Sequence, residues 1–465
     1  MMALLRSRGL WILLFTVALL RLVSLAAYPL MDTTEARYGE MARIMVETGN
    51  WLVPQIDYGV PFWGKPPLSF WASAISISLF TNSEFFMRLP NLLAAIAVLV
   101  VIWQFVLSLS FSRLQADITV AVIATTIGFL VVAGAVMTDM YLCLAMTLAM
   151  TGFWRGWHGE KIQAYVMYAG LGLGMLVKGP VLIVLVGVAL FPWLAIHFGL
   201  KNMWLLVWQR LNPVSGLLLT LLIAAPWYWL AERANPGFLE YFILGEHFQR
   251  FIDSGWKGDL YGAGHARTRG TIWVYWLLVT LPWSPWLLIK ALRAIMRKPT
   301  SIFSDQLTSF ALLWMCSPML LFTLAGNILP AYVVPGLPAV GLLVMLSIDS
   351  LHPGHSRYLL LVGPALLVIL CSYAVLVSAD RHSDRDLLAN GIDSSDDLYY
   401  LYERPYSAQY YSNGRAKLTD SIPDEDHFYL VIENKRKPDR FPNHCELRSQ
   451  NSSRQLFFCQ RQSPA

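Results

Sequence analysis

Apolar runs of membrane-spanning length recur along most of the chain. The first runs from Leu10 to Leu30; it is long and lacks a small-residue cleavage pattern, which favours a retained span over a signal peptide. Others are centred near residues 100, 127, 147, 170, 188, 222, 281, 316, 340 and 367. Because about 20 apolar residues cross a bilayer as a helix, residues 1–379 are predicted to form an all-α membrane domain of about eleven spans.

Positive residues in the short connections all fall on one side of these spans. By the positive-inside rule, that side and the N-terminus face the cytoplasm. Residues 31–89, residues 232–270 and the tail from residue 380 are then expected to face outward. The inner positive residues are Arg6, Arg8, Arg113, Arg155, Lys161, Lys201, Arg210, Lys290, Arg293, Arg297, Lys298 and Arg357.

Composition supports a membrane protein. The chain of 465 residues is 56% hydrophobic and only 14% charged, whereas a soluble chain carries about 25% charged residues. The inner loops account for the net charge of +5, so no nucleic-acid partner is needed to explain it.

The tail, residues 380–465, has frequent charges and short apolar runs such as 428–432 and 455–458. We expect a small α/β domain outside the membrane. Cys445 and Cys459 flank a polar turn there, and an outer compartment permits a disulfide; two unpaired thiols are the alternative. Cys143, Cys316 and Cys371 lie in spans and are expected to be packing residues.

The first outer loop is predicted to begin with a helix over residues 34–48, which Gly49 ends. Its apolar residues recur at helical spacing, so it is expected to lie along the membrane interface. Asp32 and Glu35 stand three apart, the spacing of a capping box. The alternative, equally open at this point, is that Asp32 faces an active site.

Lys65 precedes Pro66, Pro67 and a second predicted helix over residues 68–80. A cation at a helix N-terminus faces the positive end of the dipole, at a cost of about 0.3–1 kcal/mol. A bound anion would explain the arrangement, because helix N-termini bind phosphate. The alternative is a solvated or snorkelling lysine.

Further polar residues stand at the outer ends of later spans. Asp139 interrupts an apolar stretch and is either a helix cap or a functional acid. Lys178 ends a span, where a helix C-terminus favours a cation. In the second outer loop, Glu246 and Arg250 are four residues apart and can pair on a helix, although Arg is also suited to holding phosphate. His247 is a candidate ligand, proton carrier or packing residue.

These residues fall into seven short motifs that resemble, in order, those of the GT-C glycosyltransferases of the protein O-mannosyltransferase type. The resemblance covers roughly residues 10–350 and is strongest to the bacterial lipid A aminoarabinose transferases. The motifs are Glu35-Ala-Arg37-Tyr38-Gly-Glu40, Gly49-Asn-Trp51-Leu-Val-Pro54, Lys65-Pro66, Asp139, Val177-Lys178-Gly179, Glu246-His247-x-x-Arg250-Phe251 and Leu329-Pro330-Ala-Tyr332.

The resemblance implies an enzyme that moves a sugar from a polyprenyl phosphate, such as undecaprenyl phosphate, to lipid A or another envelope acceptor at the periplasmic face of the inner membrane. It implies that Lys65 and Arg250, with Lys178 as a third candidate, hold the lipid phosphate. The candidate catalytic acids are Asp32, Glu35 and Asp139, and the motifs mark further candidate substrate contacts at Arg37, Tyr38, Glu246, His247 and Tyr332.

The sequence departs from the family pattern at three positions. Thr34 stands where the first motif has an Asp, and Ile328 replaces a Lys. Gly64 replaces the Glu before Lys-Pro, which weakens any metal site shared with His247. We therefore expect no required cofactor, and the sugar and acceptor can differ from those of the aminoarabinose enzymes.

The expected chemistry is an inverting displacement in which cations stabilise the departing lipid phosphate. A hydroxyl acceptor needs a carboxylate base, for which Asp32 is the first choice, whereas a phosphate acceptor is already ionised. The partners are then the donor lipid, the acceptor and membrane lipids, and the chain is expected to be a monomer. One alternative is an enzyme with a protein acceptor. The other is a transporter of the lipid-linked sugar, but the large polar outer loops argue against a transporter.

Overall fold

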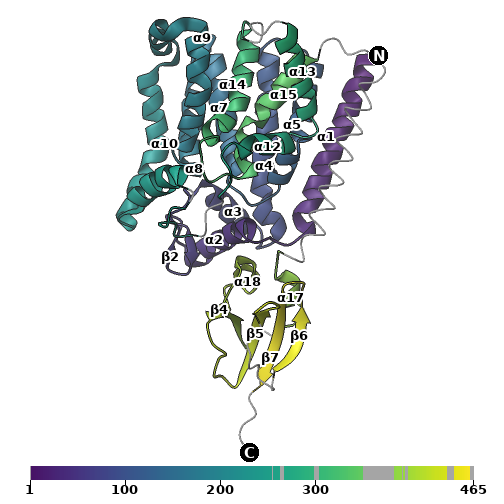
Figure 1. Ribbon diagram of the computed structural model, residues 1–465, viewed down its shortest axis with the longest axis vertical. Helices are drawn as coiled ribbons and strands as arrows, with labels where there is room; N and C mark the ends of the chain where they lie inside the picture. The colour runs from purple at the N-terminus through teal and green to yellow at the C-terminus, as the bar shows by residue number, and fades with distance from the viewer. Residues whose placement is uncertain are drawn as a thin grey trace, which may run out of the picture.

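The structure, a computed structural model, describes residues 2–253, 255–261, 266–297, 303–348, 382–389, 391–392, 396–436 and 445–460. A bundle of helices forms one part of the molecule and a small sheet domain forms the other (Figure 1). The predicted span near residue 367, Cys371 and the boundary at residue 380 lie outside the described residues.

The helices of the bundle and its outer loops alternate with short turns. They are α1 (Met2–Ala27), α2 (Thr34–Thr48), α3 (Leu68–Leu79), α4 (Glu84–Ser108), α5 (Arg113–Ala124), α6 (Ile127–Val132), α7 (Asp139–Trp157), α8 (Lys161–Lys178), α9 (Val181–Leu211), α10 (Pro213–Ala234), the π-helix η1 (Glu240–Gln249), α11 (Arg250–Ile252), α12 (Thr271–Val279), α13 (Ser284–Arg297), α14 (Gln306–Phe322), the 3-10 helix η3 (Pro330–Gly336) and α15 (Leu337–Ser347). A two-stranded hairpin, β1 (Gln55–Asp57) and β2 (Val60–Pro61), lies between α2 and α3.

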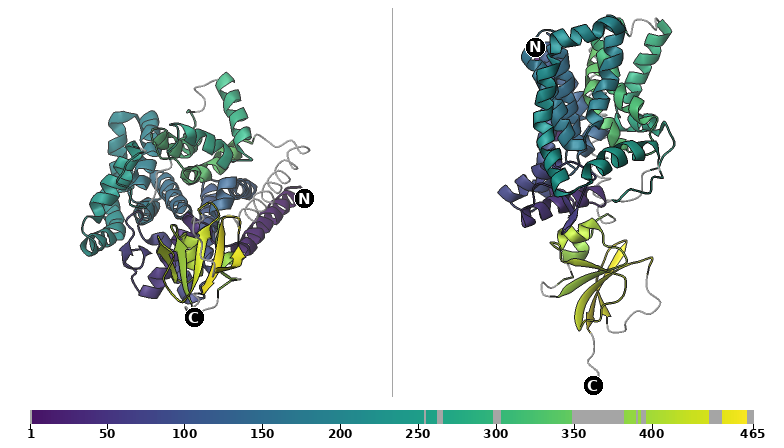
Figure 2. Two further views of the ribbon diagram at one scale, coloured as in Figure 1. Left: turned by 60° about the horizontal axis from the view of Figure 1, so that its bottom comes forward. Right: turned by 90° about the vertical axis from the view of Figure 1, so that its left-hand side faces the viewer.

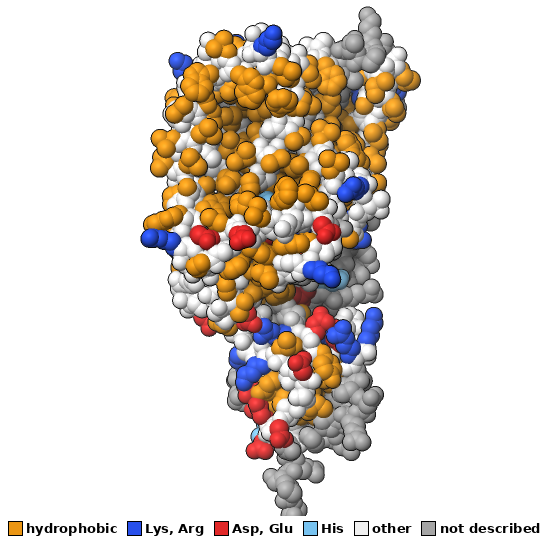
Figure 3. All heavy atoms as spheres, turned by 60° about the vertical axis from the view of Figure 1, so that its left-hand side comes forward, with side chains coloured by type: hydrophobic (Ala, Val, Ile, Leu, Met, Phe, Trp, Pro, Cys, Tyr) orange, Lys and Arg blue, Asp and Glu red, His pale blue; other side chains and the backbone are white. Residues whose placement is uncertain are grey.

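The described part of the chain contains five helical segments long and apolar enough to cross a membrane, or six if the bent pair α12–α13 is one span. Figure 3 shows hydrophobic side chains over much of the helical part, whereas charged ones gather towards and on the sheet domain, with a few at the opposite end. This distribution suits a bilayer around the bundle. The polytopic helical fold predicted from the sequence is confirmed in this coarse form.

Two of the predicted spans are not single straight helices. Near residue 127 the chain breaks between α5 and α6, where the Thr126 hydroxyl caps α6 by accepting a hydrogen bond from Phe129 N–H. Near residue 281, α12 and α13 meet at 115°, and Pro282 in that break has no N–H to continue a helix. The two breaks touch, because Ile127 N–H donates to the Leu281 carbonyl at 3.0 Å. The average hydropathy used to predict spans does not reveal such breaks within an apolar segment.

The C-terminal domain is a five-stranded mixed sheet in the order β4-β3-β5-β7-β6. β3 pairs in parallel with β4 and β5, and the remaining pairs are antiparallel, which agrees with the predicted small α/β domain and its two apolar strands. Cys445 and Cys459 lie opposite each other on β6 and β7 and form a disulfide. The elements are α17 (Arg385–Ala389), β3 (Asp397–Leu401), α18 (Tyr406–Tyr411), β4 (Ala416–Thr419), β5 (His427–Glu433), β6 (Cys445–Gln450) and β7 (Arg454–Gln460).

The sheet domain meets the bundle through α18, which packs on α2 (Figures 1 and 2). The contact combines apolar packing of Tyr410 against the buried cluster of α2 and α3 with hydrogen bonds in both directions. Leu30 N–H donates to the Tyr411 hydroxyl at 2.7 Å, and three carboxylates of the bundle accept from the sheet domain. Asp32 accepts from Ser407 N–H at 3.0 Å, Asp57 accepts from the Gln409 amide at 2.9 Å, and Glu84 accepts from the Tyr411 hydroxyl at 3.0 Å.

Candidate active site

The predicted helix of the first outer loop is α2, and Gly49 ends it with a left-handed φ of 69°. The prediction that Asp32 and Glu35 form a capping box is wrong, because no side chain caps this helix. Glu35 instead forms a buried ion pair with Arg88 of α4, with oxygen–nitrogen distances of 2.7 and 2.8 Å. Arg88 also donates to the carbonyls of Leu25, Tyr28 and Pro29. Glu35 therefore fastens α2 to the bundle, and its predicted catalytic role stays a prediction.

Asp32 lies at the junction with the sheet domain. Both carboxylate oxygens accept hydrogen bonds from Ser407, one from its N–H and one from its hydroxyl. Burial raises the pKa of Asp32 to about 6, and the Ser407 hydrogen bonds offset this only in part. Its predicted role as the base is not tested by these contacts.

Lys65 stands directly before Pro66 and Pro67 at the N-terminus of α3, as predicted. Its Nζ donates to the Gly64 carbonyl at 2.5 Å and lies 3.7 Å from Glu246 Oε2. The side chain is 23% exposed. Lys65 is thus held loosely by its carboxylate partner, at the end of a helix whose first N–H groups have no side-chain cap.

Glu246 on η1 joins the two outer loops. Both of its oxygens accept from Arg250 Nη1, at 3.0 and 2.9 Å, which confirms the pairing expected from their spacing. Burial raises the pKa of Glu246, but Lys65 and Arg250 outweigh burial and hold the pKa below its usual value. Arg250 Nη2 also lies 3.3 Å from Asp259, an acid that no sequence motif marks.

Lys178 and Asp139 form a second ion pair at 2.6 Å, both largely buried. The Lys178 ammonium lies 5.4 Å from the centre of the Tyr332 ring, and cation–π contact at this distance is attractive. The sequence placed these residues on three different spans, and the fold brings them together.

His247 connects this pair to η1. Its Nδ1 lies 2.7 Å from the Phe242 carbonyl and its Nε2 lies 2.8 Å from the Lys178 carbonyl. Because both partners are acceptors, a neutral imidazole can donate to only one of them. Burial nevertheless lowers the pKa of His247, and the two carbonyls offset this only in part. The ring positions the end of α8 against η1.

Arg37 and Tyr38 lie beside the second outer loop. Arg37 Nη1 donates to the Tyr261 carbonyl at 3.3 Å, and its guanidinium lies 5.2–5.9 Å from the rings of Tyr38, Phe62 and Tyr406. Its buried Nε has no hydrogen-bond partner among the described residues. Tyr406 belongs to the sheet domain, so this cation touches all three outer segments.

The fold thus forms two ion-pair groups, Lys65 and Arg250 with Glu246 and Lys178 with Asp139. His247, next to Glu246 in the chain, links them through its 2.8 Å contact with the Lys178 carbonyl; we call the five charged residues the cation cluster. Asp32 and Glu35 make their hydrogen bonds elsewhere. No group of three or more His, Cys, Asp or Glu suited to a metal occurs in the described ranges. Fixed cations of this kind can stabilise a phosphate that gains charge.

The model of the dolichyl-phosphate-mannose-protein mannosyltransferase family matches residues 10–242. The chain is 28% identical, over 376 residues, to an undecaprenyl phosphate-alpha-4-amino-4-deoxy-L-arabinose arabinosyl transferase of Aeromonas hydrophila, covering 78% of this chain and 65% of the relative. It is also 28% identical to the Edwardsiella ictaluri protein of that name, covering 78% and 66%. The chain thus spans less than two thirds of the length of these relatives.

Among solved structures, the fold is similar to ArnT from Cupriavidus metallidurans bound to undecaprenyl phosphate. The TM-score is 0.76 at 18% identity, covering 96% of this chain and 98% of the other. The apo state of the same protein matches with a TM-score of 0.75 at 19% identity. These likenesses show that the fold is shared.

Proposed function

Because the chain belongs to the dolichyl-phosphate-mannose-protein mannosyltransferase family, we propose that it is an inverting membrane glycosyltransferase. The donor is a sugar on undecaprenyl phosphate, and the acceptor is lipid A or another envelope glycolipid. The names of the arabinosyl transferase relatives support this donor. The observation that carries the proposal is the cation cluster, in which His247 links the ion pairs of Lys65 and Arg250 with Glu246 to the Lys178–Asp139 pair.

The cation cluster suits a lipid phosphate leaving group. Breaking the bond between the sugar and the phosphate places negative charge on phosphate oxygen, which preorganised cations stabilise. Glu246 and Asp139 hold Arg250 and Lys178 in position, so little reorganisation is needed. Lys65, 3.7 Å from its carboxylate, has the most freedom to turn to the phosphate.

A hydroxyl acceptor would need a base. We propose Asp139 for this role, because it is the acid that lies in the cation cluster beside Lys178. Asp32, the first choice from the sequence, is bonded to Ser407 and would act only after the sheet domain moves. Glu35, bonded to Arg88, acts in this proposal by holding α2. A phosphate acceptor would need no base.

The remaining assignments are part of the same proposal. The chain is a monomer of the inner membrane with about eleven spans, a cytoplasmic N-terminus and a periplasmic sheet domain, residues 380–465. The positive-inside pattern and the disulfide between Cys445 and Cys459 support this orientation. A protein acceptor is the second candidate function, because the family model is named for protein mannosyltransferases.

The proposal is tested by transfer from purified undecaprenyl-phosphate sugar. Lys65→Ala and Arg250→Ala should each lower turnover at least ten- to a hundredfold, because a charge-assisted hydrogen bond is worth about 1.5–3 kcal/mol. Lys257→Ala and Arg233→Ala are matched controls, since both side chains are exposed and lie outside the cation cluster. Thermal unfolding should be unchanged in Lys65→Ala and in both controls. Arg250→Ala removes a partner of the buried Glu246 carboxylate, so its turnover is compared per folded molecule. Near-wild-type turnover in Lys65→Ala would mean that the phosphate site is misplaced.

A further inference from the structure

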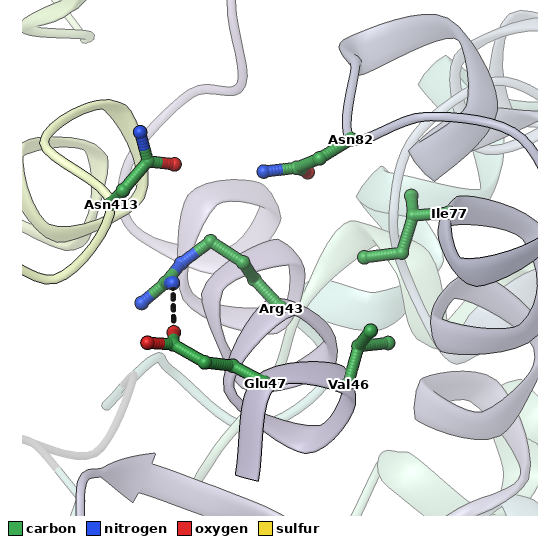
Figure 4. A pocket seen from close by; sticks show the side chains of 6 residues that line it. All are labelled: Arg43, Val46, Glu47, Ile77, Asn82 and Asn413. Atoms are coloured by element: carbon green, nitrogen blue, oxygen red, sulfur yellow. Dashed lines mark hydrogen bonds and ion pairs between the residues drawn. The ribbon is translucent and has the colours of Figure 1, made fainter. Parts of the chain in front are cut away.

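A cavity of about 250 Å³ lies where the first outer loop meets the sheet domain. Figure 4 shows its lining from both parts of the molecule. Three of its residues come from α2, one from α3, one from the turn after α3 and one from the turn after α18. They are Arg43, Val46, Glu47, Ile77, Asn82 and Asn413.

Two carboxamides point into this cavity from opposite sides (Figure 4). The Asn82 oxygen accepts from the Tyr410 hydroxyl at 2.8 Å, which leaves its amide N–H groups for the cavity. The Asn413 side chain has no hydrogen bond within the described part of the chain. Asn413 and Gly414 both have left-handed φ, 52° and 78°, and this turn brings the carboxamide against α2.

The charge of the cavity excludes an anionic ligand. Arg43 is already paired with Glu40 at 2.7 Å and with Glu47 at 2.5 Å. The charge of Arg43 is therefore already compensated, and Glu47 is the acid that lines the cavity. A hydrogen bond from Tyr58 lowers the pKa of Glu47, so that carboxylate is ionised at neutral pH. The cavity suits a neutral or cationic ligand and repels a phosphate.

The shape favours a compact polyol over a peptide. The volume lies just below the roughly 300–1,000 Å³ of drug-sized sites, so it suits a single ring. Val46 and Ile77 offer an apolar surface for ring C–H groups. The α2 and α3 backbones are paired within their helices, so no strand edge is open to extend a peptide.

We propose that this junction cavity is a second, sugar-binding subsite, which holds one neutral or amino-sugar ring of the acceptor between α2 and the sheet domain. Arg43 follows Arg37 by six residues, about 9 Å along α2, and Arg37 contacts the second outer loop at Tyr261. The helix that lines the cavity therefore also touches the loop that carries Glu246 and Arg250. The inference rests on the proposed function because it names the acceptor as a glycan.

The test is ligand-observed saturation-transfer NMR on the full chain in nanodiscs, with glucosamine, glucose and an acetyl-Gly-Thr-Gly-amide peptide as probes. We expect both sugars to bind, glucosamine more tightly than glucose because of Glu47. Asn413→Gly keeps the left-handed turn and removes the carboxamide, so it should weaken sugar binding about two- to tenfold. Asn434→Gly, the same change at an exposed position of this domain, should leave binding unchanged. Asn82→Ala should repeat the loss.

The proposal is overturned if wild-type protein saturates neither sugar, if only the peptide is saturated, or if Asn413→Gly binds sugar as wild type does. Hydrolysis of undecaprenyl-phosphate sugar without acceptor is measured on the same variants and should be unaffected. If the protein shows neither hydrolysis nor transfer but still binds sugar in a way that depends on Asn413, the proposed function is rejected and the sugar-binding subsite is retained.

Discussion

At the scale of single residues, the Glu35–Arg88 pair shows how a motif acid can be structural. The Arg88 side chain is fully buried, and its guanidinium donates to Glu35 and to three backbone carbonyls. Such a buried charge is tolerated only when it is paired and hydrogen-bonded. The pair fixes the start of α2, which carries Arg37 and Tyr38.

Glu35→Gln should therefore lower stability by about 3–5 kcal/mol, because it leaves the Arg88 charge buried without compensation. Glu160→Gln is the matched control: its partner Arg155 is solvent-accessible, and such a pair is worth only about 0–1 kcal/mol. Unfolding in detergent measures both. If Glu35 is structural, turnover per folded molecule changes little. A stable but inactive Glu35→Gln would instead support the catalytic role.

The sequence predicted the five residues of the cation cluster better than it predicted which of them pair. Lys65 is indicated by its unfavourable place at a helix N-terminus, and Arg250 by its spacing from Glu246 and its suitability for phosphate. Lys178 is indicated by its place at the end of a span and by the family motif. Their pairing with Asp139 and Glu246 was accessible only for Arg250, four residues from Glu246 on one helix. Arg88 and Asp259 were missed because their contacts join distant segments and lack a local pattern.

At the scale of elements, the π-helix η1 determines how the second outer loop meets α8. The sequence predicted an ordinary helical face here, and a π-helix is not visible in residue spacing. Gly179 ends α8 with a φ of 72°. A Cβ at this position would lie 2.7 Å from the Phe242 ring and 3.1 Å from His247. The close approach of Lys178 and η1 therefore depends on a glycine.

Gly179→Ala should reduce transfer although it alters no charged group. The substitution strains a left-handed residue, at a cost of about 1–3 kcal/mol, and pushes η1 away from Lys178. Gly187→Ala in α9 is the matched control, because a Cβ there meets nothing within 4 Å and alanine favours a helix. Transfer assays on both variants, with thermal unfolding alongside, make the comparison. Equal activity of the two would mean that the contact does not position the site.

Local signals predicted some elements closely and others poorly. The α2 and α3 helices were predicted within one residue, from Gly49 and from Pro66–Pro67. The strands β5 and β7 followed from apolar runs. The breaks between α5 and α6 and between α12 and α13 were missed, because the segments on both sides are equally apolar and the bends are set by tertiary contacts such as Ile127 with Leu281.

At the scale of the whole molecule, three carboxylates of the bundle, Asp32, Asp57 and Glu84, accept hydrogen bonds from the sheet domain. Ionised carboxylates at a partly buried contact lose hydration that the new hydrogen bonds must replace. For Asp32 the hydrogen bonds do not fully replace the lost hydration, since burial raises its pKa from 3.8 to about 6 despite two hydrogen bonds from Ser407. Asp384 raises the Asp32 pKa further, and Arg454 lowers it.

Docking of the sheet domain should therefore depend on pH. The docked state has the higher Asp32 pKa, so the docked state binds a proton more tightly than an undocked one. The favourable contribution is complete below about pH 4 and is lost as pH rises through about 6. The shift corresponds to about 3 kcal/mol, or roughly a hundredfold in the docking equilibrium.

Amide hydrogen exchange of α18, corrected for intrinsic rates, should show greater protection at pH 5 than at pH 8. Asp32→Asn, which mimics the protonated carboxyl, should remove most of this difference, whereas Asp397→Asn at the exposed first residue of β3 should keep it. An unchanged pH response in Asp32→Asn would show that another group controls the contact.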